Sequence, residues 1–266
     1  MKTLKETACL ALMALSPLLA VADEPAFSAG RPGNTESPLA VPKGYFQVET
    51  GIASYTYDNS DGVRTRAWDL AHTALRYGIA KDTDVQLVIQ PYTQQSTHGA
   101  YHDQTFQGFG STTFRVLHTF MGADGSSPAF GLIGFATFPT ASKELTDNGI
   151  LSDRTEGGVI ATGSMSLNDK TSVTLTLGEA ARHAGNNNYI SDLSGGVNLT
   201  YAFTEKLGAY VEGFADHVGY QPTTATLDLG ATYLLDRVTQ LDAGVNMGLN
   251  HDTSDANFFV GWSHRF

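Results

Sequence analysis

The feature that most constrains the fold is a two-residue alternation of apolar and mixed side chains that recurs along almost the whole chain. The clearest case is the last segment, where one face carries Phe258, Val260, Trp262, His264 and Phe266. Successive side chains of a β-strand point to opposite faces, so this period predicts strands. After residue 22, no apolar run approaches the roughly 18 residues of a membrane-spanning helix. The sequence therefore predicts an all-β chain.

Alternation alone does not distinguish a water-soluble sandwich from a membrane barrel, whose apolar faces contact lipid. Two features favour the barrel. Short connections such as 80–83 and 204–206 alternate with longer polar ones such as 93–107 and 139–155, as expected for periplasmic turns and outer loops. The opposite faces are rich in Gly, Asn, Ser and Thr, few of which a dry core would tolerate.

The chain also ends in a pattern that resembles the terminal signal read by the outer-membrane assembly machinery. Phe266 is the last residue, and the apolar side chains before it repeat at two-residue spacing. We therefore take Phe258, Val260, Trp262, His264 and Phe266 as a candidate assembly signal. His264 stands where such signals often have Tyr.

Counting the alternating segments predicts about twelve strands. They are 45–57, 66–79, 84–92, 108–120, 129–138, 156–167, 171–178, 189–203, 207–216, 224–234, 239–250 and 257–266. An even number places both termini in the periplasm, and closure leaves no unpaired backbone in lipid. We expect residues 44–266 to form a transmembrane antiparallel up-and-down β-barrel.

The N-terminus predicts export. Lys2 and Lys5 precede an apolar stretch at 8–20, and the small-x-small site 20–22 comes directly before Asp23. Residues 1–22 are therefore expected to be a signal peptide, and residues 23–43 a periplasmic N-terminal extension. Cys9, the single cysteine, would leave with the signal, so the mature chain would contain no disulfide and no thiol nucleophile.

Net charge and motif content narrow the function. A formal charge of −11 disfavours nucleic-acid binding. The expected location is the outer membrane of a Gram-negative bacterium. The expected partners are outer-membrane lipids and lipopolysaccharide, the barrel assembly machinery and a small-molecule solute.

No catalytic or metal site can be assembled from the sequence, and no cofactor is expected. The histidines are scattered, and 58–62 lacks the ligand spacing of a calcium loop. The leading function is a passive channel rather than an enzyme. An outer-membrane lipid hydrolase and a closed structural or adhesion barrel stay open as alternatives.

Charged residues with lumen-facing parity are the best candidates for a functional site. They are Glu49, Arg76, Arg115, Asp192, Glu212, Asp216, Asp228, Asp242 and Arg265. Burying a lone charge is costly, so these groups either form a salt-bridged network or line a hydrated constriction with a transverse field. If the lumen conducts, six acidic against three basic residues favour cations.

An ordered series of short motifs runs through the chain. These are Arg-Pro-Gly at 31–33, Val-Pro-Lys-Gly-Tyr-Phe-Gln-Val-Glu-Thr-Gly at 41–51, Leu-Arg-Tyr-Gly-Ile at 75–79, Gly-Phe-Gly at 108–110, Phe-Pro-Thr at 138–140, Thr-Tyr-Leu-Leu at 232–235 and the ending 258–266. The series resembles the outer-membrane transporter family associated with the meta-cleavage pathway of phenol degradation. Ser111 and His264 depart from that family's pattern. The resemblance implies uptake of small, often aromatic or hydrophobic compounds.

Overall fold

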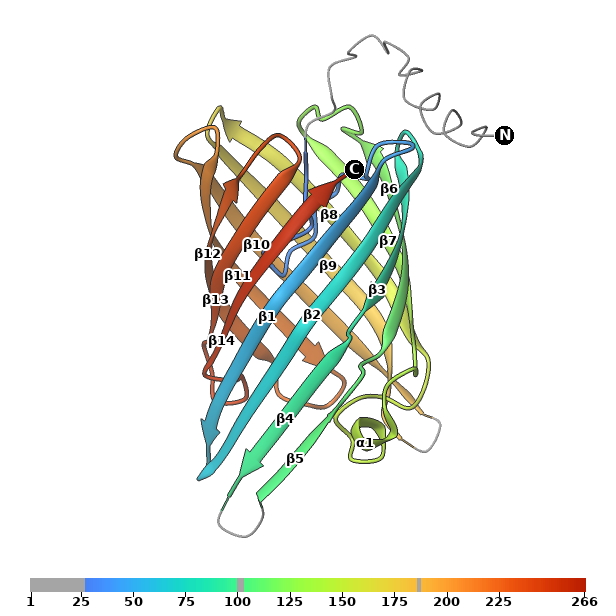
Figure 1. Cartoon of the computed structure of the whole chain (residues 1–266), viewed down its shortest axis with the longest axis vertical. Coiled ribbons are helices and arrows are strands. Elements are labelled where there is room, and N and C mark those ends of the chain that lie inside the picture. Colours follow the sequence, from blue (N-terminus) through green and yellow to red (C-terminus); the bar gives the residue numbers. More distant parts are fainter. Residues whose placement is uncertain (1–26, 100–102, 186–187) are drawn as a thin grey trace, which may run out of the picture.

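The computed structural model describes residues 27–99, 103–185 and 188–266, which form one closed β-barrel (Figure 1). Its strands are β1 (Phe46–Ser60), β2 (Val63–Ala80), β3 (Thr83–Ile89), β4 (Tyr92–His98), β5 (Asp103–Gly108), β6 (Thr112–Met121), β7 (Ala129–Phe138), β8 (Glu156–Asn168), β9 (Thr171–His183), β10 (Tyr189–Ala202), β11 (Leu207–Val218), β12 (Thr224–Leu234), β13 (Thr239–Gly248) and β14 (Ala256–Arg265). One short helix, α1 (Lys143–Thr146), lies between β7 and β8. Among the described residues, no helix is long and apolar enough to cross a membrane.

The fourteen segments make the twelve strands expected from the sequence. Both β3 and β4 pair with β2, while β6 pairs with β3 and β5 pairs with β4. Each of the pairs β3/β4 and β5/β6 is therefore one strand with an interruption. Pro91 lies in the first interruption, where it cannot donate to a ladder. Antiparallel pairing of β1 with both β14 and β2 closes the barrel.

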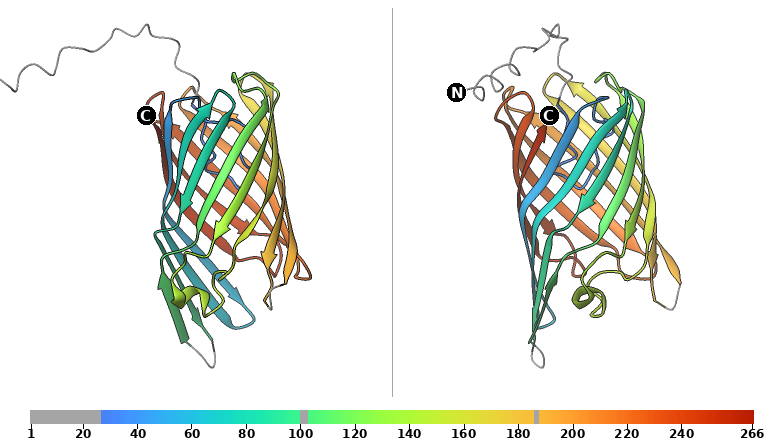
Figure 2. Two further views of the ribbon diagram at one scale, coloured as in Figure 1. Left: turned by 90° about the vertical axis from the view of Figure 1, so that its right-hand side faces the viewer. Right: turned by 45° about the vertical axis from the view of Figure 1, so that its right-hand side comes forward.

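The strands are longer at one end than the sequence predicted. Residues 93–107, expected to be an irregular loop, contain β4, β5 and the connection between them, and this hairpin projects beyond the rest of the wall (Figures 1 and 2). Residues 58–64, also expected to be a loop, mostly extend the strands: β1 ends at Ser60 and β2 begins at Val63, so the turn has only two residues. Asp61 and Gly62 there have φ values of 53° and 77°, the left-handed values that such a hairpin turn requires.

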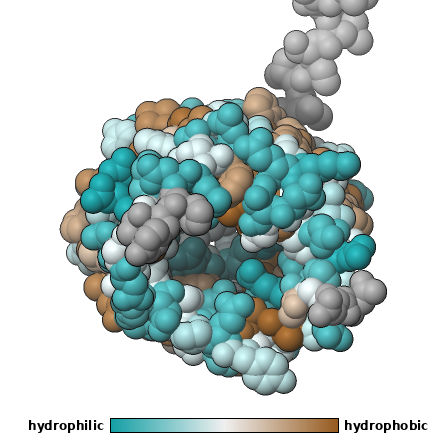
Figure 3. All heavy atoms as spheres, turned by 90° about the horizontal axis from the view of Figure 1, so that it is seen from below, coloured by the Kyte–Doolittle hydropathy of each residue, from teal (hydrophilic) through white to brown (hydrophobic). Residues whose placement is uncertain are grey.

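The two faces of the wall have the polarity of a membrane barrel. Large apolar side chains such as Leu199, Val211 and Leu229 are exposed on the outside. By contrast, Glu212 and Asp228 lie fully buried inside. We call the end that carries the C-terminus the turn end and the opposite end the loop end. Seen from the loop end, the rim is mainly hydrophilic around a hollow (Figure 3).

Part of the segment 23–43, expected to be a periplasmic extension, lies inside the barrel, which corrects that expectation for its described residues. Residues 30–41, which we call the plug, run within the lumen, where Figure 1 draws them as a thin blue trace. They hydrogen-bond to the wall. The plug has no strand or helix of its own, so its polar groups need partners on the wall. Residues 1–26, and with them the expected signal peptide 1–22, lie outside the described residues.

Candidate functional site

The plug makes an almost complete circuit of the lumen. From Gly30 to Val41, its hydrogen-bond partners follow one another around the wall. They are Glu49 of β1, Asp242 of β13, Glu212 of β11 and Asp228 of β12, Thr176 of β9 and Thr162 of β8, Arg115 and Thr119 of β6, Arg76 of β2, and Asp84 of β3. Because the bonds reach most of the strands, the plug is held by the closed wall as a whole.

Arg31 of the plug occupies a shaped site in the wall. Its Nε and Nη2 atoms donate to the two carboxylate oxygens of Asp242, at 3.2 and 2.9 Å. Gly51 and Gly261, which face each other across β1 and β14, leave the room for the guanidinium. A Cβ on Gly261 would lie 2.5 Å from both Nε and Nη2. The Phe259 ring centroid is 5.8 Å from Cζ of Arg31. These four wall residues are called the Arg31 site below.

Next along the plug, Asn34 and Thr35 bind a pair of buried carboxylates. Glu212 and Asp228 face each other across β11 and β12, and both are fully buried. Glu212 accepts from the backbone N–H of Asn34 (2.7 Å), the N–H of Thr35 (3.1 Å) and the Thr35 hydroxyl (2.6 Å). The Asn34 side-chain amide donates to Asp228 at 2.8 Å. Within the described residues neither carboxylate forms an ion pair, so plug amides and a hydroxyl supply much of their hydrogen bonding.

One further ion pair and one arginine–carboxylate triad lie at the plug. Arg115 of β6 donates from Nη2 to Glu36 of the plug at 2.6 Å. Arg76 of β2 lies between Glu49 and Asp84, at 2.7 and 2.6 Å, and also donates to the plug carbonyl of Leu39. The Arg115–Glu36 pair joins the plug to the wall. The Arg76 triad is made of wall residues alone, and the plug contacts it through the Leu39 carbonyl.

The plug separates two cavities. A cavity of about 690 Å³ opens toward the loop end, and one of about 450 Å³ opens toward the turn end. The plug residues that line both of them are Gly30, Arg31, Pro32, Gly33 and Glu36. The partition between the cavities is therefore a single thickness of polypeptide.

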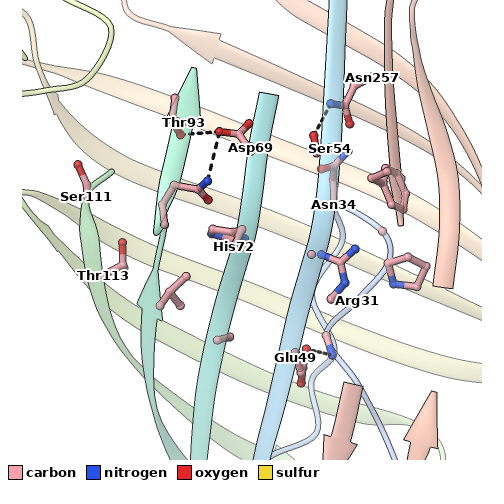
Figure 4. Close-up of a pocket in the computed structure, with 18 of the residues that line it drawn as sticks. Arg31, Asn34, Glu49, Ser54, Asp69, His72, Thr93, Ser111, Thr113 and Asn257 are labelled. Atoms are coloured by element: carbon pink, nitrogen blue, oxygen red, sulfur yellow. Dashed lines mark hydrogen bonds between the residues drawn. The ribbon is translucent and has the colours of Figure 1, made fainter. Parts of the chain in front are cut away.

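A backbone irregularity shapes the loop-end cavity, which Figure 4 shows in close-up. Ala71 of β2 has a φ of 56°, and the β1–β2 pairing skips Ile52 and Ala71 between the pairs Gly51/His72 and Ala53/Leu70. As a result both Asp69 and His72 line the cavity, although their spacing in a regular strand would put them on opposite faces. The sequence pattern did not reveal these two residues.

The structure brings most of the nine predicted lumen charges into this polar interior. Seven are buried, namely Glu49, Arg76, Asp192, Glu212, Asp228, Asp242 and Arg265, while Arg115 and Asp216 are partly exposed. Asp192 and Asp216 meet Arg182 at the loop end, away from the plug. Arg265 lies over the rings of Phe27 and Tyr45 at the turn end.

Sequence reasoning missed the partners of these charges. Arg31 and Glu36 were assigned to the periplasm, and Asp84 and Arg182 were left off the lumen list. Asp84 shares its parity with Gln86, so strand alternation could have identified it. The Arg-Pro-Gly motif at 31–33 marks Arg31 but gives no sign of its partner, because Asp242 is 211 residues away.

The candidate assembly residues share the outer face of β14. Phe258, Val260 and Phe266 are exposed, and the Trp262 and His264 rings are stacked with centroids 5.7 Å apart. Phe266 extends the seam, because its N–H donates to Phe46 O at 2.7 Å.

The hydrolase alternative needs a serine bonded to a histidine. The loop-end cavity does contain Ser54, His72 and Asn257. However, Ser54 Oγ accepts a hydrogen bond from Asn257 at 2.8 Å, and in the part of the chain that the structure describes His72 bonds to neither residue. This arrangement lacks the base that would activate the serine.

Comparisons with known proteins agree with the barrel fold. The family model described as "Putative MetA-pathway of phenol degradation" matches residues 29–266. The crystal structure of an outer membrane channel from Pseudomonas putida F1 is 14% identical, with a TM-score of 0.61 over 89% of this chain and 99% of that one. The translocator domain of the autotransporter NalP from Neisseria meningitidis is 10% identical, with a TM-score of 0.52 over 85% and 90%. No curated protein matches the sequence.

Proposed function

The chain belongs to the family of the MetA-pathway of phenol degradation, and from this premise we propose that it is an outer-membrane channel for passive entry of small solutes, closed at rest by the plug. In this proposal the turn end faces the periplasm, the apolar wall contacts outer-membrane lipid, and the signal peptide ends at Ala22. The barrel architecture and the two aligned cavities support it.

The observation that carries the proposal is the thickness of the partition. Five plug residues line both cavities, so displacing the plug would join the two cavities into a path through the barrel. The plug is held by hydrogen bonds and ion pairs that water or solute could replace. It could therefore move while the strand ladders of the wall stay intact.

A test of the closed state can leave every charge unchanged. Gly261→Ala places a methyl group against both Arg31 and Oδ1 of Asp242, so it should break their ion pair and displace the plug from the wall. Gly213→Ala is the matched control, because a Cβ there meets nothing within 4 Å. In planar bilayers we expect sustained conductance from Gly261→Ala and mostly closed records from the wild type and Gly213→Ala. Equal conductance of all three would contradict gating by the plug.

A second variant disrupts the same ion pair without adding a methyl group at Gly261. Arg31→Gln combined with Asp242→Asn removes the ion pair as a whole, so no unpaired charge is left buried. It should also raise conductance, while the heat-modifiable mobility of the folded barrel on gels should be retained. If both folded variants stay closed, another element closes the lumen.

The solute class is a finer proposal. Phe259, Ile150, Leu151 and Val88 contribute apolar surface to a loop-end cavity that also contains charged and amide side chains. A solute with a flat apolar body and a polar end would fit this mixture. Liposome swelling with matched aromatic and aliphatic solutes, using Gly261→Ala, would show whether aromatic solutes pass faster.

A further inference from the structure

The Arg31 site belongs to the wall and not to the plug. Asp242 lies on β13, Gly51 on β1, and Phe259 and Gly261 on β14. All four pair with residues of neighbouring strands, with one β-bulge next to Gly51, so the site keeps its shape when the plug moves. Arg31 is thus comparable to a ligand tethered in a preformed pocket.

That pocket requires a cation. The Asp242 side chain has no exposed surface, and Arg31 is its only ion-pair partner among the described residues. Withdrawing Arg31 would leave the Asp242 carboxylate without its cation and facing the cavities that the plug had separated, where a cationic solute could take the place of Arg31. The same movement removes the Asn34 and Thr35 donors from Glu212 and Asp228. The exposed wall would then be acidic and short of hydrogen-bond donors.

The shape of the pocket favours a planar cation. Two nitrogens of one guanidinium bond to the two oxygens of Asp242, a fork that a single ammonium nitrogen cannot reproduce. The facing glycines admit a flat group that any Cβ on Gly261 would exclude, and the Phe259 ring adds a cation–π contact. A guanidinium or amidinium group matches all these contacts.

The pocket can also be reached from the loop end. Arg31, Gly51 and Phe259 all line the loop-end cavity, together with plug residues such as Gly30 and Gly33, so a solute that enters there contacts the guanidinium of Arg31. Asp242 and Gly261 do not line this cavity while Arg31 is in place. We propose that the Arg31 site is a recognition site for small solutes bearing a planar guanidinium or amidinium cation, and that Arg31 occupies it as an internal competitor in the closed state. Binding stands independently of the proposed function; only the link to opening rests on it.

The binding test uses methylguanidinium and isothermal titration calorimetry on the full barrel in detergent. Arg31→Ala empties the site and should bind one methylguanidinium, whereas the wild type should bind at least about tenfold more weakly because the site is filled. Adding Asp242→Asn to Arg31→Ala should weaken binding by at least about tenfold, since the charge-assisted hydrogen bonds to Asp242 are lost. Methylammonium should also bind Arg31→Ala at least about tenfold more weakly.

Arg182→Ala is the matched control, since it vacates another arginine–aspartate pair. The side chain of Arg182 is 48% exposed, and no facing glycines surround its guanidinium. Binding of methylguanidinium to Arg182→Ala as tight as to Arg31→Ala would overturn the proposal. So would an Arg31→Ala barrel that is folded by its gel mobility yet binds none.

A charge exchange tests the link to opening. Arg31→Asp with Asp242→Arg keeps the ion pair but reverses it. Methylguanidinium should raise wild-type conductance, and acetate should have that effect on the exchanged variant. Binding to Arg31→Ala without any such rise would uphold the recognition site and contradict the plugged-channel function. Opening of both proteins by either ion would instead show a general salt effect and overturn recognition.

Discussion

Arg76 shows how a single side chain in the lumen depends on its partners. Its guanidinium contacts Glu49 and Asp84 in a fully buried setting, so neither carboxylate is left unpaired. Strand parity predicted that Glu49 and Arg76 face inward, because alternation is a local property of sequence. It could not predict that Arg31 neutralises Asp242, because the plug has no periodicity and the two residues meet only in the closed barrel.

We predict that Arg76→Gln lowers the free energy of unfolding by about 3–5 kcal/mol, since it leaves two carboxylates buried without their cation. The triple variant Arg76→Gln, Glu49→Gln, Asp84→Asn removes the charges together and should recover most of that loss. Urea unfolding in detergent, followed by intrinsic fluorescence, measures both. If the triple variant is no more stable than Arg76→Gln, the charges are not what destabilises the single variant.

At the scale of the strands, the sequence predicted best where one face meets lipid. The bounds of β7 and β12 agree with the expected segments, because both strands alternate cleanly. The β4–β5 hairpin was taken for a loop, because Gln94, Gln95, Ser96 and Thr97 are polar on both faces and give no alternation. A strand that projects beyond the membrane is not required to have an apolar face.

The outward face can be tested at Leu199 of β10, which is exposed on the barrel surface. Leu199→Arg should destabilise the folded barrel by about 2–4 kcal/mol if the residue lies near the bilayer midplane. Leu199→Met, which keeps the side chain apolar, is the control. Folding titrations into lipid vesicles give the difference, and equal stability of the two variants would mean that this face does not contact lipid.

Variants at the end of β14 can separate recognition by the assembly machinery from closure of the barrel at the β1–β14 seam. Phe266→Asp should lower the yield of assembled barrel in cells, because the terminal aromatic is the expected signal. The same purified variant should still fold into vesicles that contain no assembly machinery. Tyr220→Asp, at a fully exposed position near the loop end, is the control for loss of an aromatic ring. Equal loss in cells and vesicles would instead point to the Phe46–Phe266 seam contact.

At the scale of the whole molecule, the barrel class followed from alternation, connection lengths and the C-terminal pattern, whereas the closed lumen did not. Twelve strands were predictable because each is defined by its own residues. The plug is defined by the wall, through partners spread over most of the strands. A reading of one segment at a time therefore assigned its Pro-, Gly- and Ser-rich sequence to a periplasmic extension.

The circuit of plug contacts also bears on the order of two assembly steps, closure of the β1–β14 seam and docking of the plug. Before β1 meets β14, joining Arg31 to Asp242 requires closing a loop across 211 residues, whereas afterwards Gly51 lies opposite Gly261 beside the Arg31 site. Closure entropy grows with loop length, so the contact forms more readily once the seam exists. We therefore expect a newly inserted barrel to pass through an unplugged stage, with docking of the plug following closure of the wall.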